Sequence, residues 1–590
     1  MKEKILKIIL VILIILLFVV TFIVYKYKNI EKENINIVDN NILQKQVLTD
    51  NMIEKYKNDK TITIDNPKVI NNPYYLSPLT SVIIFYTETE EEIVLKVNDG
   101  EEIKFSSSNE HVIPIYGLYP DYNNKIIIST KNFNKEIYIE TDKIDIPNME
   151  LEVNKVGINE NFLVTTTTYP IIYNSDGEVI WYLTENFSED IVFLENGHII
   201  LSTSKLLLDN FTKTGFVEID LLGKIYNEYI LNGGYHNQML LLDNGNYLVL
   251  SSNVNDISDK GVLVEINKSN GKVVKRLILK DIFNSIDYTS SLLDIESFTY
   301  NNGKVIMYLK NINALITIDY DTQKIISIYS DNEIFDSPIY QEYLTNINFN
   351  NISTVKFIND NLNVFYNSIN EANYDCNNLQ IDNASIVKYG ENMQEKSKIN
   401  LNITNIGNTD IEKIDSNNLV VLSSNNFNDK SGVCDVNYDF YGEIYIYNEN
   451  ELIFSGLLDY DTNSISTLNL YENRMNVNTI KYNIFSPDFI ISEINSHEIN
   501  NLLKNADKID VSYTIDNIYF NLNLLESINS EVEVLFISKN KQSYKINIKE
   551  KGEQIKSNFN IGSISGTFDL YIKINNTYYE LDKNIQLNNN

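Results

Sequence analysis

The stretch Gln238–Leu250 reads QMLLLDNGNYLVL and places two short apolar runs on either side of an Asp-Asn-Gly-Asn turn. Asn-Gly turns between apolar runs are strong signals for a β-hairpin, because glycine adopts the left-handed backbone conformation that these turns require. The same order of strand, turn and strand recurs at Ile191–Leu201, Ser297–Leu309, Thr354–Phe365 and Ile411–Leu422. This internal repeat decides the predicted architecture.

A second hairpin follows most of these repeats. Four of these outer hairpins are Gly261–Leu277, Ala314–Ser327, Ala384–Lys398 and Gly442–Ser455. Units of four strands at spacings of about 45 to 60 residues are typical of propeller blades rather than of solenoid repeats. Five units are visible, and Phe162–Leu183 supplies most of a sixth, which we expect strands near Asn476–Phe485 to close. The prediction is a six-bladed β-propeller over residues 151–486.

Two further β-rich regions flank the repeats. Residues 61–150 contain strand patterns such as Ser81–Thr87 (SVIIFYT), separated by turns such as Asn98-Asp99-Gly100, and we predict a small β-sandwich. Residues 487–590 also alternate as strands and predict a second, C-terminal sandwich-like domain. The 40 Tyr and 25 Phe among 590 residues fit this all-β class.

The N-terminus contains a long apolar run, Ile8–Val24, with lysines on both sides. The run is long enough to cross most of a bilayer and lacks a small-residue cleavage site after it, so we predict a transmembrane anchor over residues 1–28. A cleaved signal peptide is the alternative. Residues 29–60 are predicted to form a stalk or linker, and the short charged leading segment places the body outside the cytoplasm.

The formal net charge of −32 disfavours binding to nucleic acid, which an acidic surface would repel. The predicted contact with a membrane is therefore through the N-terminal helix alone. Only Cys376 and Cys434 are present, and an oxidising exterior would permit a disulfide between them.

Two segments in the N-terminal half and one after the repeats point to a known family. These are Asn72–Thr80 (NPYYLSPLT), His111–Tyr122 (HVIPIYGLYPDY) and Tyr471–Met475 (YENRM). Together they resemble segments of the PAPS-independent arylsulfate sulfotransferases, and the resemblance covers roughly Asn72–Phe485. It implies a six-bladed propeller whose central mouth transfers a sulfuryl group from a phenolic sulfate to a phenol through a sulfohistidine.

The residues at the matching positions are partly altered. His236 precedes the hairpin Gln238–Leu250 and matches one family histidine, so it is the candidate nucleophile or base. Asp294 and Glu296 stand where the family has a histidine and an asparagine, and Lys310 stands near the place of an arginine. Two carboxylates thus replace two groups that suit a sulfate.

The family's nucleophilic histidine is not found. It is expected just before Thr354–Phe365, where this chain has Asn350-Asn351-Ile352-Ser353. The four histidines are His111, His198, His236 and His497, so none lies in that interval. We interpret His111, His198 and His497 as structural or exposed.

Three other residues are candidates for binding a phenolic substrate: Arg474 in the YENRM segment, Tyr308 and Tyr235. Asp294 and Glu296 share one face of a strand and would also suit a hard cation such as Ca²⁺ through oxygen ligands. No Walker loop, zinc-spaced Cys/His set or G-x-S-x-G segment is present, and no other cofactor is expected.

Two functional hypotheses follow. The first is a membrane-anchored, exported arylsulfate sulfotransferase with a rearranged site, in which His236 and Lys310 act on aryl sulfates and phenols. The second is a pseudoenzyme, a non-catalytic propeller that serves as a surface ligand-binding or scaffold module. The missing nucleophile and the acidic substitutions favour the second; the family resemblance supports the first.

Overall fold

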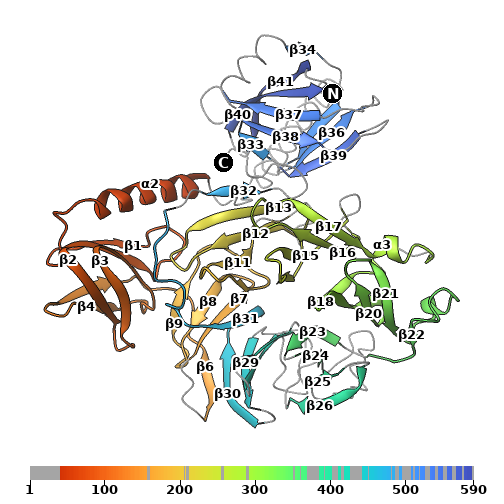
Figure 1. The fold of residues 1–590 in the computed structure, drawn as a ribbon, viewed down its shortest axis with the longest axis horizontal. Helices are drawn as coiled ribbons and strands as arrows, with labels where there is room; N and C mark the ends of the chain where they lie inside the picture. The colour runs from red at the N-terminus through yellow and green to blue at the C-terminus, as the bar shows by residue number, and fades with distance from the viewer. Residues whose placement is uncertain are drawn as a thin grey trace, which may run out of the picture.

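The computed structural model of the chain describes residues 40–587 except for internal gaps. These gaps are 156–159, 205, 207–211, 254–257, 287–290, 350–351, 359, 368–383, 391–392, 402–408, 414–417, 425–441, 449–450, 461, 480–481, 486–490, 494–505, 509–511, 517–518, 525–531, 539–542, 549–554, 561–565 and 575–576. Figure 1 shows a ring of β-sheets with one smaller β-domain beside it and another above it. The prediction of an all-β protein is confirmed.

Six β-sheets form the ring as blades, each with four antiparallel strands, and three of them carry a fifth strand at the outer edge (Figure 1). In chain order the first five blades are β10 (Val192–Phe193), β11 (Ile199–Ser202), β12 (Lys213–Ile219) and β13 (Ile225–Tyr235); β14 (Met239–Leu241), β15 (Tyr247–Ser251), β16 (Val262–Ile266) and β17 (Val273–Ile278); β18 (Ile295–Asn301), β19 (Lys304–Leu309), β20 (Ala314–Asp319) and β21 (Lys324–Tyr329); β23 (Ile352–Ile358), β24 (Asn361–Tyr366), β25 (Ser385–Tyr389) and β26 (Glu395–Asn400); and β27 (Thr409–Lys413), β28 (Asn418–Ser424), β29 (Gly442–Asn448) and β30 (Glu451–Leu458). Middle strands such as β16 are buried at every position because both faces of a blade pack on neighbouring blades.

The sixth blade joins the two ends of the ring. Its three outer strands are β7 (Asn161–Thr166), β8 (Pro170–Tyr173) and β9 (Val179–Tyr182), and its innermost strand is β31 (Thr462–Leu468), which pairs antiparallel with β7. The expectation that strands near Asn476–Phe485 close the ring is therefore wrong. The strand found there, β32 (Asn483–Phe485), pairs in parallel with β13 at the outer edge of the first blade.

The N-terminal domain is built around one long strand. β2 (Ser81–Val97) pairs along its first half with β1 (Lys68–Asn71) and along both halves with β3 (Ile103–Ile115), and its last residues pair with β4 (Asn123–Ser129), next to β5 (Asn134–Glu140). Apolar side chains of this domain form one core with those of the fifth and sixth blades. The next strand, β6 (Glu150–Asn154), extends the fifth blade beyond β30.

The helix α2 (Asn40–Lys57) lies within the predicted linker and packs against the body of the protein (Figure 1). Its Gln46 side chain is buried and donates to the backbone carbonyl of Gly223, in the first blade. Asp50 forms an ion pair with the buried Lys224 at 2.7 Å. These contacts fix the helix to the propeller, so this part of the linker is a docked element and not a free stalk.

The C-terminal residues form two sheets. One has six strands in the order β33, β38, β37, β40, β41 and β34, and the other has the order β35, β36 and β39. Their bounds are β33 (Ile491–Glu493), β34 (Ala506–Lys508), β35 (Ser512–Asp516), β36 (Tyr519–Leu524), β37 (Val532–Ile537), β38 (Tyr544–Ile548), β39 (Ile555–Asn560), β40 (Gly566–Ile574) and β41 (Thr577–Leu587). Short elements complete the third blade and its surroundings: α3 (Leu279–Ile282), η1 (Lys310–Ile312), η2 (Glu333–Phe335) and β22 (Leu344–Thr345).

Within the described part of the chain, no helix is long and apolar enough to cross a membrane. The predicted anchor over residues 1–28 lies outside the described residues. Cys376 and Cys434 also lie outside them, so the predicted disulfide stays a prediction.

Candidate functional site: a carboxylate-rich central pocket

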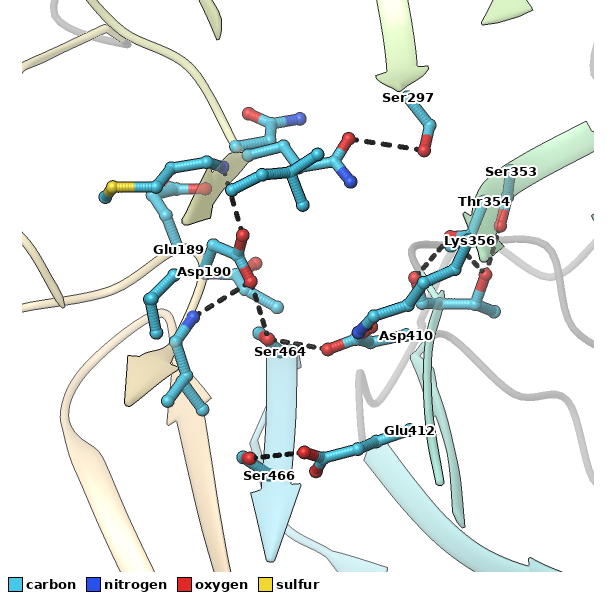
Figure 2. A pocket seen from close by; sticks show the side chains of 18 of the residues that line it. Glu189, Asp190, Ser297, Ser353, Thr354, Lys356, Asp410, Glu412, Ser464 and Ser466 are labelled. Atoms are coloured by element: carbon cyan, nitrogen blue, oxygen red, sulfur yellow. Dashed lines mark hydrogen bonds and ion pairs between the residues drawn. The ribbon is translucent and has the colours of Figure 1, made fainter. Parts of the chain in front are cut away.

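A pocket of about 380 Å³ lies where the innermost strands of the blades meet. All six of these strands contribute lining residues, and polar side chains predominate among them (Figure 2). Its charged lining residues are Glu189, Asp190, Glu296, Lys356, Asp410 and Glu412. Five carboxyl groups thus face one ammonium group, and no histidine is found among the described residues that line the pocket.

Asp410 on β27 is held by several hydrogen bonds (Figure 2). Its Oδ2 accepts from the Ser464 hydroxyl at 2.6 Å and from the backbone N–H of Ile465 at 3.2 Å, both on the closing strand β31. Its Oδ1 lies 3.2 Å from the ammonium group of Lys356 on β23. Asp410 therefore connects three neighbouring blades through side-chain contacts.

Asp190, just before β10, lies on the other side of the same serine (Figure 2). Its Oδ1 is 3.3 Å from the Ser464 hydroxyl, and its Oδ2 accepts from the backbone N–H of Met239 at 3.0 Å. A serine hydroxyl has only one proton to donate. Since that proton goes to the closer carboxylate of Asp410, the contact with Asp190 is favourable when Asp190 is itself protonated.

Burial and, second to it, the negative charge of Asp410 together raise the pKa of Asp190 to about 7, against the opposing effects of Lys356 and two backbone N–H groups. The hydrogen-bond geometry at Ser464 points in the same direction. Asp190 is consequently a carboxyl group that exchanges its proton near neutral pH, which suits a general acid or base.

Lys356 is the cation of the pocket. Burial alone would lower the pKa of its ammonium group, but the carboxylates of Asp410, Glu412 and Asp190 outweigh burial and raise it. Glu412 accepts from the Ser466 hydroxyl at 2.8 Å and has a pKa raised by burial. Lys356 thus stays charged, and these carboxylates of the protein balance its positive charge.

The structure brings only some of the sequence-predicted residues to this pocket. Glu296 and Ser353 line it, and Lys310 lies beside it with its Nζ 3.7 Å from Glu296 Oε1. His236 is buried, and its Nε2 is 2.6 Å from the Ser252 hydroxyl. Asp294 does not line the pocket, and its Oδ1 accepts from the backbone N–H of Lys260.

Ile352 and the candidate tyrosines pack in hydrophobic clusters. Ile352 and Tyr308 are buried in the same cluster, and the hydroxyl of Tyr308 donates to Asn313. Burial raises the pKa of Tyr308 to about 12, so its phenol is neutral at physiological pH. Tyr235 is fully buried against the aromatic side chains of the first and second blades, and burial raises its pKa well above the usual value.

Arg474 lies elsewhere. Its Nε donates to the carbonyl of Gly197 at 2.7 Å and its Nη1 to the carbonyls of Asn469 and Glu472. Its guanidinium group lies 5.1 Å from the centre of the Phe193 ring. It lines a second cavity that shares no lining residue with the central pocket, so the structure does not bring Arg474 together with His236 and Lys310.

Sequence reasoning missed five charged lining residues: Glu189, Asp190, Lys356, Asp410 and Glu412. A signal was present in the last three, because each is a charged residue at an alternate position of an innermost strand. Such positions face the central axis of a propeller, whereas an outer strand would bury them between blades. Asp190 lies before a strand of only two residues, so no comparable alternating pattern marks it in the sequence.

The predicted Ca²⁺ pair has other partners. Asp294 binds a backbone N–H group and Glu296 pairs with Lys310. Across the described residues, no three side chains of histidine, cysteine, aspartate or glutamate are grouped so that they could hold a metal ion.

Two protein-family models match the sequence of this chain. The model of the family "Arylsulfotransferase (ASST)" matches residues 124–482, and that of the "Arylsulfotransferase Ig-like domain" matches residues 68–147. The chain belongs to the arylsulfotransferase family. The resemblance stated from the sequence motifs is therefore confirmed, and the N-terminal sheet around β2 is the family's Ig-like domain.

Similar solved structures are distant. They include BamB from Moraxella catarrhalis, at 10% identity over 59% of this chain and 93% of that one with a TM-score of 0.28. A quinonprotein alcohol dehydrogenase-like protein from Bacteroides thetaiotaomicron has 12% identity over 68% and 94%, with a TM-score of 0.28. The Cps50 (Swd1) β-propeller domain of Myceliophteria thermophila has 10% identity over 68% and 95%, with a TM-score of 0.29. These low TM-scores assign no function to the chain, and no curated protein matches it.

Proposed function

We propose that this member of the arylsulfotransferase family binds a cationic organic ligand in its central pocket and does not transfer sulfuryl groups through a histidine. One observation carries the proposal: the pocket that all six blades line has five carboxyl groups, one lysine and no histidine among its described lining residues. This corresponds to the hypothesis of a non-catalytic propeller, with the class of ligand added.

The electrostatics of the pocket disfavour a sulfate. At about 4 Å and an effective dielectric constant of about 20, each carboxylate repels a unit negative charge by about 4 kcal/mol. Lys356 is the only cation among the described lining residues, and Asp410 already holds it at 3.2 Å. An amine or guanidinium ligand would instead find several carboxylates and the acceptor oxygens of serine and threonine side chains.

Sulfuryl transfer is the second candidate, because the family match supports an arylsulfotransferase-like function. It would use an aryl sulfate and a phenol, with His236 as nucleophile or base and Lys310 as sulfate ligand. The buried His236 ring is bonded to Ser252, and Lys310 lies near Glu296, so both groups would have to leave these partners to act.

Measuring the binding of two organic amines and of one aryl sulfate to the purified protein tests the first candidate. We expect calorimetry to detect benzylamine or putrescine and not phenyl sulfate. Glu412→Gln should weaken amine binding at least about tenfold, since removing one carboxylate near the ligand costs more than about 1.4 kcal/mol. The matched control is Glu451→Gln, which removes an exposed carboxylate outside the pocket. Tighter binding of phenyl sulfate than of either amine would contradict the proposal.

A transfer assay tests the second candidate on the same samples. The donor is p-nitrophenyl sulfate or 4-methylumbelliferyl sulfate, and the acceptor is phenol. Turnover that is lost in His236→Ala and Lys310→Ala would establish a sulfotransferase with an unusual nucleophile. We expect no turnover from a sample that unfolds cooperatively on heating.

The location of the protein is a separate proposal. We infer from Ile8–Val24 and its flanking lysines that residues 1–28 anchor the protein in a membrane with its body on the extracytoplasmic side. Fractionation of cells that express the full chain, or a chain that lacks residues 1–28, tests it. Recovery of the full chain in the soluble fraction would contradict it.

A further inference from the structure

A second cavity of about 490 Å³ lies apart from the central pocket. It is formed by the turn between β10 and β11, by the segment that follows β31 and by Tyr116 near the end of β3, so it joins the first blade, the end of the propeller and the Ig-like domain. Its volume is within the range of about 300 to 1,000 Å³ that is typical of small-molecule sites.

His198 is one of the side chains that line this cavity. The residue is 7% exposed, and its Nδ1 lies 2.6 Å from Glu218 Oε1. Glu218 accepts the proton of Nδ1, and in the neutral imidazole the other ring nitrogen, Nε2, is then a hydrogen-bond acceptor. Within the described residues, Nε2 has no hydrogen-bond partner, and the stacked ring of Tyr226 at 4.0 Å holds the imidazole in place.

Arg474 supplies a complementary donor. Its Nε and Nη1 are used by backbone carbonyls, while Nη2 has no hydrogen-bond partner in the described part of the chain. The guanidinium group lies against the Phe193 ring, and the hydroxyl of Tyr116 donates to the backbone carbonyl of Arg474 and so fixes the main chain there. The cavity is therefore lined by one side chain that can accept a hydrogen bond and one that can donate one.

The charges around the cavity select a neutral ligand. Arg474 and the carboxyl-bearing residues Asp220 and Glu195 all line the cavity, so an anion and a cation each meet a like charge. Side chains of Asn473 and Asn476, both exposed, lie at the cavity and can donate as well as accept. Hydroxyl groups, which also do both, match this lining.

We propose that this second cavity binds a small neutral polyhydroxylated ligand of monosaccharide size, with one hydroxyl donating to His198 Nε2 and another accepting from Arg474 Nη2. The site is independent of the central pocket and does not rest on the cation-binding proposal. It gives this chain a place for a neutral sugar-like molecule at the contact between its propeller and its Ig-like domain.

Ligand-observed NMR with the full chain tests the proposal, with glucose, galactose and N-acetylglucosamine as neutral probes. Glucuronate and glucosamine are the charged counterparts. We expect at least one neutral sugar to bind saturably, and both charged counterparts of glucose to bind more weakly than glucose. His198→Phe keeps a ring on Tyr226 but removes Nε2, and should weaken binding about tenfold.

Because His198→Phe leaves the Glu218 carboxylate without its buried partner, a second variant tests the cavity without changing that pair. Asn476→Trp fills the cavity from its exposed side and should abolish binding. Asn270→Trp places the same bulk on an exposed turn of the second blade and should not change it. The proposal is overturned if no neutral sugar binds saturably, if binding survives Asn476→Trp, or if a charged counterpart binds more tightly than glucose.

Discussion

Replacing Asp190 by asparagine should remove a pH-dependent loss of stability. A carboxyl group with a pKa of about 7 in the folded protein, against 3.8 in the unfolded chain, takes up a proton on folding at pH values between these two. Its contribution to the free energy of unfolding is therefore fully present below about pH 4 and decreases as the pH rises to about 7. An asparagine has no proton to lose and should show no such decrease.

The expected size follows from the same interval. Between pH 5 and pH 7 the wild-type protein should lose up to about 2.7 kcal/mol at about 1.36 kcal/mol per pH unit. We expect about 2 kcal/mol, since the pocket is open to water and part of the penalty is screened. The difference in the free energy of unfolding between Asp190→Asn and wild type should change by this amount in favour of the variant.

Urea unfolding at pH 5, 6, 7 and 8 measures this difference. Trp181 is the only tryptophan in the sequence and is fully buried in the sixth blade, so its fluorescence reports on the propeller. The control is Asp243→Asn, which removes an exposed carboxyl group in a turn of the second blade. If the profiles of Asp190→Asn and wild type stay parallel from pH 5 to pH 8, Asp190 does not titrate near neutrality and the reasoning is refuted.

Three further predictions concern stability and are checked by unfolding curves. Gly197→Ala should destabilise the protein by about 2 to 3 kcal/mol, because its φ is +84° and a Cβ would overlap with a facing backbone carbonyl oxygen. Gly245→Ala, at φ +80° with open space around it, should destabilise it by about 1 kcal/mol. Equal losses of stability in the two variants would contradict the packing argument. Lys224→Met should cost about 3 to 5 kcal/mol by leaving the Asp50 carboxylate unpaired, and adding Asp50→Leu should recover part of that loss, which a purely steric effect would not allow. Burial lowers the pKa of His111 to about 4, so the wild type should lose up to about 3 kcal/mol as the pH falls from 6.5 to 4, and His111→Phe should not; a shared acid profile would disprove this.

The repeating hairpins of the propeller could be predicted because local signals and the fold agree there. In β14 and β15, an Asn-Gly turn joins two apolar runs, and the structure forms a hairpin at those residues. The closing strand Thr462–Leu468 (TNSISTL) was missed because its serine and threonine side chains line the channel or bond to neighbouring strands. An innermost strand of this kind lacks the apolar pattern by which the other strands are recognised.

The candidate site was harder to predict because it depends on how separate blades come together. Family matching directed attention to His236 and Lys310, whereas the pocket is built around Lys356 and Asp410, whose contact joins strands 54 residues apart in the sequence. Arg474 keeps its family position, but its place on Phe193 and on backbone carbonyls follows from tertiary packing. No pattern in the sequence alone contains that information.

The way in which the sixth blade closes has a consequence for the order of events during synthesis. Ser464, on the last strand of the ring, is the residue that connects Asp190 near its beginning with Asp410 in the fifth blade. The two carboxyl groups therefore come into contact only after about four-fifths of the chain has left the ribosome. Until then the first five blades form an open arc that lacks its closing strand. At mildly acidic pH Asp190 can take up a proton as the ring closes, so a newly made chain would complete this last step with less electrostatic repulsion than one at alkaline pH.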